Sequence, residues 1–351
     1  MKSEFRSIYK PFSNQINIEE KSYLYFGGTA YLGIPQNKDF IDLFIEGIKK
    51  FGLNNGTSRN NNIQLGIYND AERAAAQRYG AEHALITSSG YLAAQLVVKA
   101  LSKAGKVIYA PATHPSLWLE NEQFLNKSFS AWAEETVSFI NQSKQKNWVL
   151  ISNSMNNLFP EIYNFNFLKQ VSQDKEIILI ADDSHGIGVV NNGLSAFSTL
   201  PRQKNIQCVL VASMAKGLGV DAGLVLSSEE IINQLKQTNE FSGASPGAAA
   251  GLYAFMGAEE IYRKAWIRLQ ENINLFGSAL SPLWKFEPGF PAFQINDPDL
   301  ANKLLPQQIL VSSFPYPGVN DAPVNRIILS SWHTEEDINH LIEVLNQNQA
   351  I

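Results

Sequence analysis

One lysine in this sequence stands in a setting that could make its amine reactive. Lys216 lies among small residues and glycines in Ser213–Gly219, directly after the apolar run Cys208–Ala212. Such a run is typical of a buried strand, so Lys216 would sit at a strand end in a tight turn. An amine there can lose its proton and form a Schiff base with an aldehyde. The ordinary alternative is a solvated lysine in a glycine-rich turn, because charged side chains mostly lie at the surface.

A second apolar run leads to an acid and an imidazole. Residues 177–180 precede Asp182 and Asp183, and His185 follows. A carboxylate beside a pyridine nitrogen keeps that nitrogen protonated, and an imidazole can bind a phenolic oxygen. With Lys216 on another strand end, these groups predict a site for pyridoxal phosphate (PLP). Asp182 could instead cap a helix and His185 could be a turn histidine, but two adjacent acids allow one to cap and the other to point inward.

Further residues could complete such a site. Ser89 and Gly90 follow an apolar run, and a helix is predicted to begin at Tyr91. Backbone N–H groups at a helix N-terminus bind phosphate well, although an ordinary serine cap explains these residues equally well. Ser213 could add another hydroxyl. His114 follows another apolar run and could stack on the cofactor ring or be a packed loop histidine.

Arg326 begins an apolar run near the end of the chain. A guanidinium can hold a substrate carboxylate through two parallel hydrogen bonds. An edge-strand arginine in a surface ion pair is the alternative, and it is the more common one for such a residue taken alone.

The composition excludes several other kinds of protein. The chain has 351 residues, of which 45% are hydrophobic and 17% charged, an ordinary globular mixture with room for more than one domain. A net charge of −5 does not indicate a nucleic-acid groove or an anionic membrane patch. A single cysteine, Cys208, excludes an internal disulfide, and the histidine spacing indicates no metal site. No run is long enough to span a membrane, so we expect a soluble, cytoplasmic protein.

Apolar runs alternate with helical patterns from about residue 70 to residue 226. This alternation is typical of a mainly parallel sheet covered by helices on both faces. We predict strands at 84–87, 107–110, 148–152, 177–181, 208–212 and 223–226, and helices at 39–51, 71–79 and 91–103. Near the C-terminus we predict helices at 248–280 and 335–346 and strands at 293–295, 309–311 and 326–329. The predicted organisation is an N-terminal arm (1–38) with a strand at 23–26, a large domain (39–246) and a small α+β C-terminal domain (247–351).

Together these segments resemble the fold-type I PLP enzymes, and within them the α-oxoamine synthases, over about residues 20–346. Asp182–Gly188 is similar to that family's D-[DE]-[AS]-H-[GS]-x-G motif, and Ser213–Gly219 to its [ST]-x-x-K-x-x-G segment. Shorter matches are Tyr31–Gly33, Gly56–Arg59, Ser89–Tyr91, His114–Ser116, and Arg326 with His333. The resemblance implies an α/β, fold-type I transferase with a mainly parallel, seven-stranded-type sheet flanked by helices and a smaller α+β C-terminal domain. It also implies a homodimer.

The resemblance further implies roles for single residues. Lys216 would form the Schiff base with PLP and remove the α-proton of the substrate. The other implied roles are a ring-nitrogen partner at Asp182, a ring-oxygen partner at His185, a stacking imidazole at His114, phosphate ligands at Ser89, Gly90, Tyr91 and Ser213, and a carboxylate ligand at Arg326. The implied reaction is an acyl transfer that condenses a small amino acid with an acyl-CoA thioester.

Four positions depart from the family's pattern. Ala30 stands where an asparagine usually precedes Tyr-Leu-Gly, and Asn153 replaces a substrate-side glutamate. Tyr68 replaces a histidine at a helix start, and Gly243 removes a polar side chain from a turn. We place Asn153 beside Arg326 in the predicted substrate-binding set. Because the departures lie on the substrate side, PLP is predicted more firmly than any one substrate.

Two other functions remain open. An aminotransferase would use the same cofactor residues but release a keto acid instead of free CoA. A catalytically silent PLP-binding or partner-binding protein is a different class, and the joint presence of Lys216, Asp182 and His185 argues against it.

Overall fold

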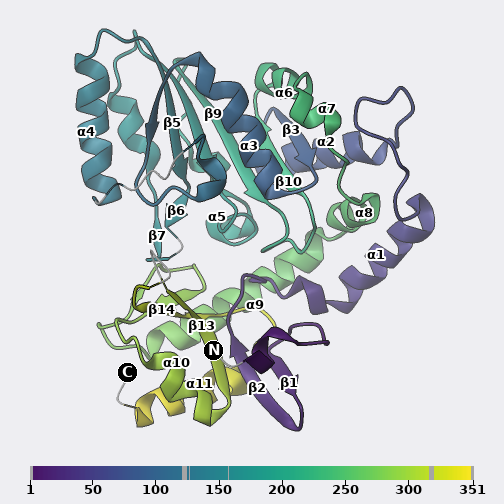
Figure 1. The fold of residues 1–351 in the computed structure, drawn as a ribbon, viewed down its shortest axis with the longest axis vertical. Coiled ribbons are helices and arrows are strands. Elements are labelled where there is room, and N and C mark those ends of the chain that lie inside the picture. Colours follow the sequence, from purple (N-terminus) through teal and green to yellow (C-terminus); the bar gives the residue numbers. More distant parts are fainter. Residues whose placement is uncertain (1–2, 121–124, 126, 157, 316–319, 349–351) are drawn as a thin grey trace.

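The computed structural model describes residues 3–120, 125, 127–156, 158–315 and 320–348, and helix α9 passes between its two large sheets (Figure 1). The first and last described elements of the chain lie beside the lower sheet in this view. The helices are α1 (Lys38–Phe51), α2 (Ile67–Tyr79), α3 (Gly90–Leu101), α4 (Phe129–Gln142), α5 (Val190–Gly193), α6 (Glu229–Lys236), α7 (Asn239–Gly243), α8 (Ala249–Gly257), α9 (Glu259–Ser278), α10 (Leu300–Leu304) and α11 (Glu335–Gln347). None of the described helices combines the length and apolar character that crossing a membrane requires.

The upper sheet contains six strands in the described part of the chain. Their order is β3 (His83–Thr87), β10 (Gly223–Ser227), β9 (Ile206–Ser213), β8 (Glu176–Asp182), β5 (Asn147–Asn153) and β4 (Lys106–Tyr109). Strands β9, β8, β5 and β4 are parallel, and β10 is antiparallel to both of its neighbours. The mainly parallel sheet is thus confirmed, with six of the seven strands that the resemblance implies.

Helices cover both faces of this sheet because its strands are apolar on both sides. In β9, Val209 and Val211 belong to the cluster that α3 and α6 complete on one face. Leu210 points the other way, into the cluster built with α2, α8 and α9. On that same face, Leu150 and Leu179 pack with α4. The sheet is therefore the middle layer of a three-layer arrangement, and its strand ends are held in fixed positions.

The lower sheet joins the two ends of the sequence. Its order is β1 (Gln15–Ile18), β2 (Lys21–Phe26), β13 (Ile309–Pro315), β14 (Pro323–Ile328), β12 (Ala292–Gln294) and β11 (Lys285–Phe286). Strands β2 and β13 are parallel, and the other pairs are antiparallel. A separate two-stranded hairpin is formed by β6 (Met155–Asn156) and β7 (Glu161–Ile162). The predicted arm thus pairs directly with the predicted small domain, and the domain boundaries stay a prediction.

The predicted single helix over 248–280 is wrong in one respect, because it is broken between α8 and α9. Ala258 leaves helical geometry, with φ −98° and ψ 15°. Glu259 and Glu260 then form the first turn of α9, where negative charge interacts favourably with the helix dipole. The break lets α8 pack beneath the upper sheet while α9 continues toward the lower one (Figure 1).

His333, in the C-terminal part of the chain, contacts the N-terminal strand β2 through a hydrogen bond and a stacked ring. Its Nδ1 accepts a hydrogen bond from the Ser330 N–H at 2.9 Å, and its Nε2 lies 3.0 Å from the Tyr25 carbonyl oxygen. The ring also stacks on Phe26 with centroids 4.4 Å apart. Only the neutral imidazole with its hydrogen on Nε2 satisfies both contacts. Burial accordingly lowers the pKa of His333 to about 4.

We expect the fold to lose stability through His333 as the pH falls. The folded pKa lies below the ordinary value of 6.5, so the unfolded chain binds the proton more readily between about pH 6.5 and pH 4. This linkage lowers the free energy of unfolding by about 2 kcal/mol between pH 7 and pH 5. Urea denaturation at the two pH values measures the loss. In His333→Gln the pH-dependent difference should shrink by that amount, and an unchanged difference would exclude His333 as its source.

Candidate active site

The parallel strands bring the predicted site residues to one edge of the upper sheet. Asn153 and Asp182 are register partners at the ends of β5 and β8, and Asp182 pairs with Val211 near the end of β9. Ser213 ends β9. Because parallel strands finish at the same edge, their following loops meet there. Loops far apart in sequence therefore face one another over this edge.

Lys216 lies in the turn between β9 and β10. Its Nζ is 2.9 Å from His185 Nε2. Burial and the nearby Arg326 charge lower the pKa of the amine, against the opposing effect of Asp182. Gly217 lets the turn approach closely, since a Cβ there would lie 2.7 Å from the Ile187 carbonyl oxygen. The site thus holds an amine that gives up its proton more easily than an ordinary lysine.

The two adjacent acids have different surroundings. Asp182 Oδ1 accepts from the Ser184 N–H at 2.8 Å, and its charge acts on Lys216. Asp183 is fully buried and accepts from Ser154 Oγ at 2.6 Å and from the Ala196 N–H at 2.9 Å. Burial raises the pKa of Asp183 to about 7. Asp183 therefore anchors neighbouring loops, whereas Asp182 faces the lysine.

His185 is bonded on both ring nitrogens. Nε2 contacts Lys216, and Nδ1 lies 2.7 Å from the hydroxyl oxygen of Tyr31. Burial and the positive charges of Lys216 and Arg326 hold its pKa well below the usual range. Tyr31 belongs to the Tyr-Leu-Gly match, but the sequence pattern alone assigns its side chain no function.

Asn153 holds the loop that carries His114. Its Oδ1 accepts from the His114 N–H at 3.0 Å, and its Nδ2 donates to the Ala112 carbonyl at 2.7 Å. His114 Nδ1 lies 2.7 Å from Ser116 Oγ, and the hydroxyl is 3.5 Å from Asp182 Oδ2. Both ends of the Asn153 amide are thus bound to backbone. Its predicted contact with substrate stays a prediction, and in the structure it fixes the His114 turn.

The predicted phosphate ligands gather at the N-terminus of α3. Ser89 caps this helix by accepting from the Leu92 N–H at 3.1 Å. A Cβ on Gly90 would lie 2.5 Å from Ser213 Cβ, so only glycine allows the two segments to meet. The first N–H groups of a helix have no acceptor within it and can bind an anion. The Tyr91 side chain is 66% exposed, so its predicted contribution is its backbone N–H.

Arg326, on the lower sheet, acts on the residues around Lys216. It lies on β14, paired in register with Ser312 and Gln294, and is 7% exposed. Its guanidinium carbon is 5.2 Å from the Phe314 ring centroid, and its charge acts on both Lys216 and His185. The two sheets therefore bring a cation and an amine close enough to interact electrostatically.

Gly56–Arg59 does not join the residues around Lys216, and its arginine makes a structural ion pair instead. Arg59 donates to Glu72 Oε1 at 2.8 Å, and both side chains are buried. The same Glu72 accepts from the Ile86 N–H of β3 at 3.1 Å. Breaking such a pair leaves a buried charge without its partner. Tyr68, nearby, donates to the Gly247 carbonyl at 3.2 Å.

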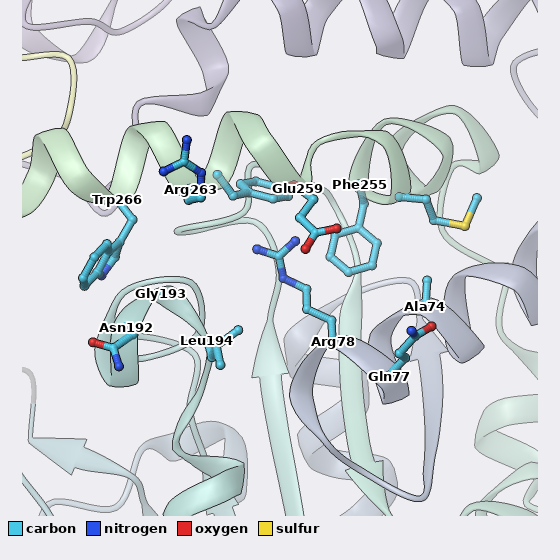
Figure 2. Close-up of a pocket in the computed structure, with 12 residues that line it drawn as sticks. Ala74, Gln77, Arg78, Asn192, Gly193, Leu194, Phe255, Glu259, Arg263 and Trp266 are labelled. Atoms are coloured by element: carbon cyan, nitrogen blue, oxygen red, sulfur yellow. The ribbon is translucent and has the colours of Figure 1, made fainter.

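A separate cavity of about 460 Å³ lies between α2, α8, α9 and residues 192–194 (Figure 2). It contains none of the predicted site residues. In Figure 2, Arg78 and Glu259 point toward each other across it. On α9 beside it, Tyr262 donates to the Leu218 carbonyl and Trp266 Nε1 to the Val189 carbonyl, both at 2.8 Å. Helix α9 thus braces the two turns that follow Lys216 and His185.

The residues at the sheet edge fit PLP. The amine of Lys216 can take up an aldehyde, Asp182 offers a carboxylate to a ring nitrogen, and the N-terminus of α3, where Gly90 meets Ser213, offers N–H groups to a phosphate. A family model described as aminotransferase class I and II matches residues 119–345. The chain belongs to this family. The family assignment confirms a PLP-dependent transferase of fold type I, as the sequence predicts.

Individual relatives show which members of the family this chain is similar to. An 8-amino-7-oxononanoate synthase from Hahella chejuensis is 27% identical, over 97% of this chain and 91% of its own length. One from Buchnera aphidicola is 26% identical, over 96% and 92%. A solved serine palmitoyltransferase variant from S. paucimobilis, with bound PLP–myriocin aldimine, is 17% identical with a TM-score of 0.81, over 97% and 91% of the two chains. The predicted resemblance to the α-oxoamine synthases is confirmed by these matches.

Proposed function

We propose that this family member condenses a small amino acid with an acyl thioester, releasing the thiol and carbon dioxide and forming an α-aminoketone. The observation that carries the proposal is the distance of 2.9 Å between Lys216 Nζ and His185 Nε2, at the strand ends where the charges of Asp182 and Arg326 also act on the amine. Relatives named 8-amino-7-oxononanoate synthase along nearly the whole chain support the acyl-transfer reaction over others of the family.

Each residue has a task in this proposal. PLP, when bound, supplies an aldehyde for covalent capture and a ring that withdraws electrons. Lys216 would hold the cofactor and later accept the α-proton of the amino acid, for which a neutral amine is required. Asp182 would pair with the ring nitrogen, His185 would donate to the ring oxygen, and His114 would lie against the ring.

The remaining groups bind the charged ends of the ligands. Ser89 and Ser213 offer hydroxyls to the phosphate, and Gly90 and Tyr91 offer backbone N–H groups. Arg326 binds the carboxylate of the amino acid through its planar fork. Since Arg326 comes from the lower sheet and Lys216 from the upper one, the substrate would bridge the two.

The relatives' product name indicates which substrates to test first. In 8-amino-7-oxononanoate the amine lies on the carbon next to the ketone. Breaking the bond between these two carbons leaves a seven-carbon diacid on one side. The other side is what alanine retains after losing its carboxylate. Alanine and the monothioester of a seven-carbon diacid are therefore the proposed pair, with glycine and serine as comparisons.

Thiol release separates this reaction from that of an aminotransferase. The PLP-loaded protein is mixed with each amino acid and with the coenzyme A monothioester of the seven-carbon diacid. Equal amounts of free thiol, carbon dioxide and aminoketone support the proposal. Formation of a keto acid without thiol release, in the presence of an amino-group acceptor, supports the aminotransferase instead.

Replacing Arg326 by lysine should raise the KM for the amino acid about 10- to 100-fold, because the charge remains but two parallel hydrogen bonds to the carboxylate become one. The KM for the thioester should stay within about twofold. Arg202→Lys, at an arginine that donates to the Gly80 carbonyl, is the matched control. Initial rates over a range of each substrate measure both constants. An unchanged KM for the amino acid would exclude Arg326 from its binding.

We also propose that the protein is a homodimer. The exposed face of α1 carries Ile41 and Ile45, and the following loop exposes Leu53 and Ile63, an apolar surface that fits burial against a second copy. Sedimentation equilibrium should therefore give twice the chain mass of 39.0 kDa. A single-chain mass would contradict this part of the proposal.

The cytoplasmic location is proposed on composition alone, since one cysteine cannot form an internal disulfide.

A further inference from the structure

Tyr31 is held rigidly where the two halves of the fold meet. Its carbonyl accepts from the Ser331 N–H at 2.9 Å, and its ring packs edge-on against Phe290 with centroids 5.5 Å apart. The side chain is 2% exposed. Its hydroxyl oxygen lies 2.7 Å from His185 Nδ1, on the side of the ring away from Lys216. A hydrogen-bonded chain therefore runs from Tyr31 through His185 to Lys216.

This series of hydrogen bonds can run in only two directions when Tyr31, His185 and Lys216 are all neutral. A neutral imidazole has one donor and one acceptor, so it must receive a hydrogen at one end and give one at the other. Either Tyr31 donates to His185 and His185 donates to Lys216, or both bonds run in reverse. Burial favours these neutral forms, because it raises the pKa of Tyr31 and lowers those of His185 and Lys216.

The surroundings of the Tyr31 hydroxyl decide between the two directions. The Arg326 guanidinium interacts electrostatically with Tyr31 and is positively charged at all relevant pH values. A neighbouring cation attracts the lone pairs of the hydroxyl oxygen and repels its hydrogen. Among the described residues, His185 Nδ1 is the one hydrogen-bond partner of this hydroxyl, so the O–H is directed toward it. The imidazole must in turn carry its own hydrogen on Nε2.

We propose that Tyr31 is a positioning residue that donates to His185 Nδ1 and thereby fixes the imidazole as the Nε2–H tautomer, facing Lys216. This inference rests on the proposed function in one respect. If His185 donates a hydrogen bond to the ring oxygen of PLP, the hydrogen must lie on Nε2, the nitrogen that faces Lys216. Tyr31 keeps the donor in place before the cofactor arrives. The N-terminal arm thus contributes to the site through His185.

The groups that face His185 are few among the described residues. They are Tyr31 from the N-terminal arm, Lys216 from the β9–β10 turn, Arg326 from β14 and His114 from the loop after β4. Three of them carry or can gain positive charge, and a second proton on the imidazole is therefore disfavoured throughout the neutral range. The tautomer, rather than the charge of His185, is what Tyr31 controls.

Nitrogen NMR of the protein without PLP tests the hydrogen positions directly. In selectively ¹⁵N-histidine-labelled protein, the signals absent from His185→Ala identify this ring. We expect a protonated Nε2 and an unprotonated, hydrogen-bonded Nδ1. In Tyr31→Phe, which keeps the ring against Phe290, the Nδ1 signal should shift or a second tautomer should appear. A proton on Nδ1 in the natural protein, or unchanged signals in Tyr31→Phe, would overturn the proposal.

A double-mutant cycle then tests whether Tyr31 acts through His185. Tyr31→Phe should weaken PLP binding about three- to tenfold, as expected for one buried hydrogen bond. In the His185→Ala background the same change should cost less than about twofold. Tyr79→Phe, at another fully buried tyrosine, should have no effect beyond about twofold. Equal losses in both backgrounds would contradict a role through His185. If the natural protein binds PLP normally while the two losses are equal, the Tyr31 proposal fails but the proposed function does not.

Discussion

Replacing Lys216 by alanine is expected to abolish the aldimine absorption of the PLP-loaded protein without amino acid and to lower product formation by about 10⁴-fold or more. The variant loses both the amine that captures the aldehyde and the base that takes the α-proton, and each of these contributes several orders of magnitude. Spectra of dialysed protein and a thiol-release assay measure the two effects.

Two controls make this result specific. Lys216→Arg keeps a basic side chain of similar length but cannot capture an aldehyde under these conditions, so it should be as inactive as the alanine variant. Lys175→Ala changes another lysine with a buried side chain, whose Nζ donates to the Ser143 carbonyl at 2.6 Å. That variant should keep the visible band. A visible band in Lys216→Ala that survives dialysis would contradict the assignment of this lysine.

Replacing Asp182 by asparagine should lower kcat by about 10²- to 10⁴-fold while leaving PLP bound. A neutral amide does not stabilise a protonated ring nitrogen, so electron withdrawal from the substrate carbon is lost in the transition state. The isosteric change keeps the acceptor for the Ser184 N–H, which preserves the local turn. Steady-state rates and the retained visible band together separate this effect from a loss of cofactor.

Asp183→Asn is the matched control for this prediction. Asp183 binds Ser154 and Ala196 rather than facing Lys216, so its replacement should lower the free energy of unfolding by about 1–3 kcal/mol. Its kcat should remain within about tenfold of the natural value. If Asp182→Asn kept more than a tenth of the natural kcat, the ring-nitrogen role would belong to another group.

The upper sheet was predictable because its strands are short, apolar and separated by helical patterns. Each predicted strand of this sheet overlaps an observed one, from β3 at residue 83 to β10 at residue 227. Once these strands are parallel, Asp182 and Ser213 must end at the same edge. The meeting of Lys216 with His185 then follows from two loops that leave neighbouring strands.

The long-range pairings were not predictable from local patterns. Strand β2 pairs with β13 across almost the whole chain, and no composition signal links the two. Tyr31 reaches His185 through the same tertiary arrangement, although Tyr-Leu-Gly stands out in the sequence. Helix α4 was missed even though Ser128 caps it and Phe129, Trp132 and other buried residues follow at helical spacing. That spacing was the available signal.

The pair of acids shows how a local pattern leaves a choice that packing resolves. Asp182 and Asp183 are chemically identical and adjacent, and either could point inward. Asp182 ends β8 and Asp183 is the first residue after it, and the two side chains have different partners. Asp183 enters the buried side with Ser154, so Asp182 is the acid left beside the lysine.

Borohydride reduction of the PLP-loaded protein, followed by digestion and mass spectrometry, tests the central claim most directly. Reduction makes the bond between cofactor and lysine permanent, so the modified residue can be read from a peptide. The account predicts one pyridoxyl group per chain, on the peptide that contains Lys216. Modification of a different lysine, or no stable modification at saturating PLP, would contradict it.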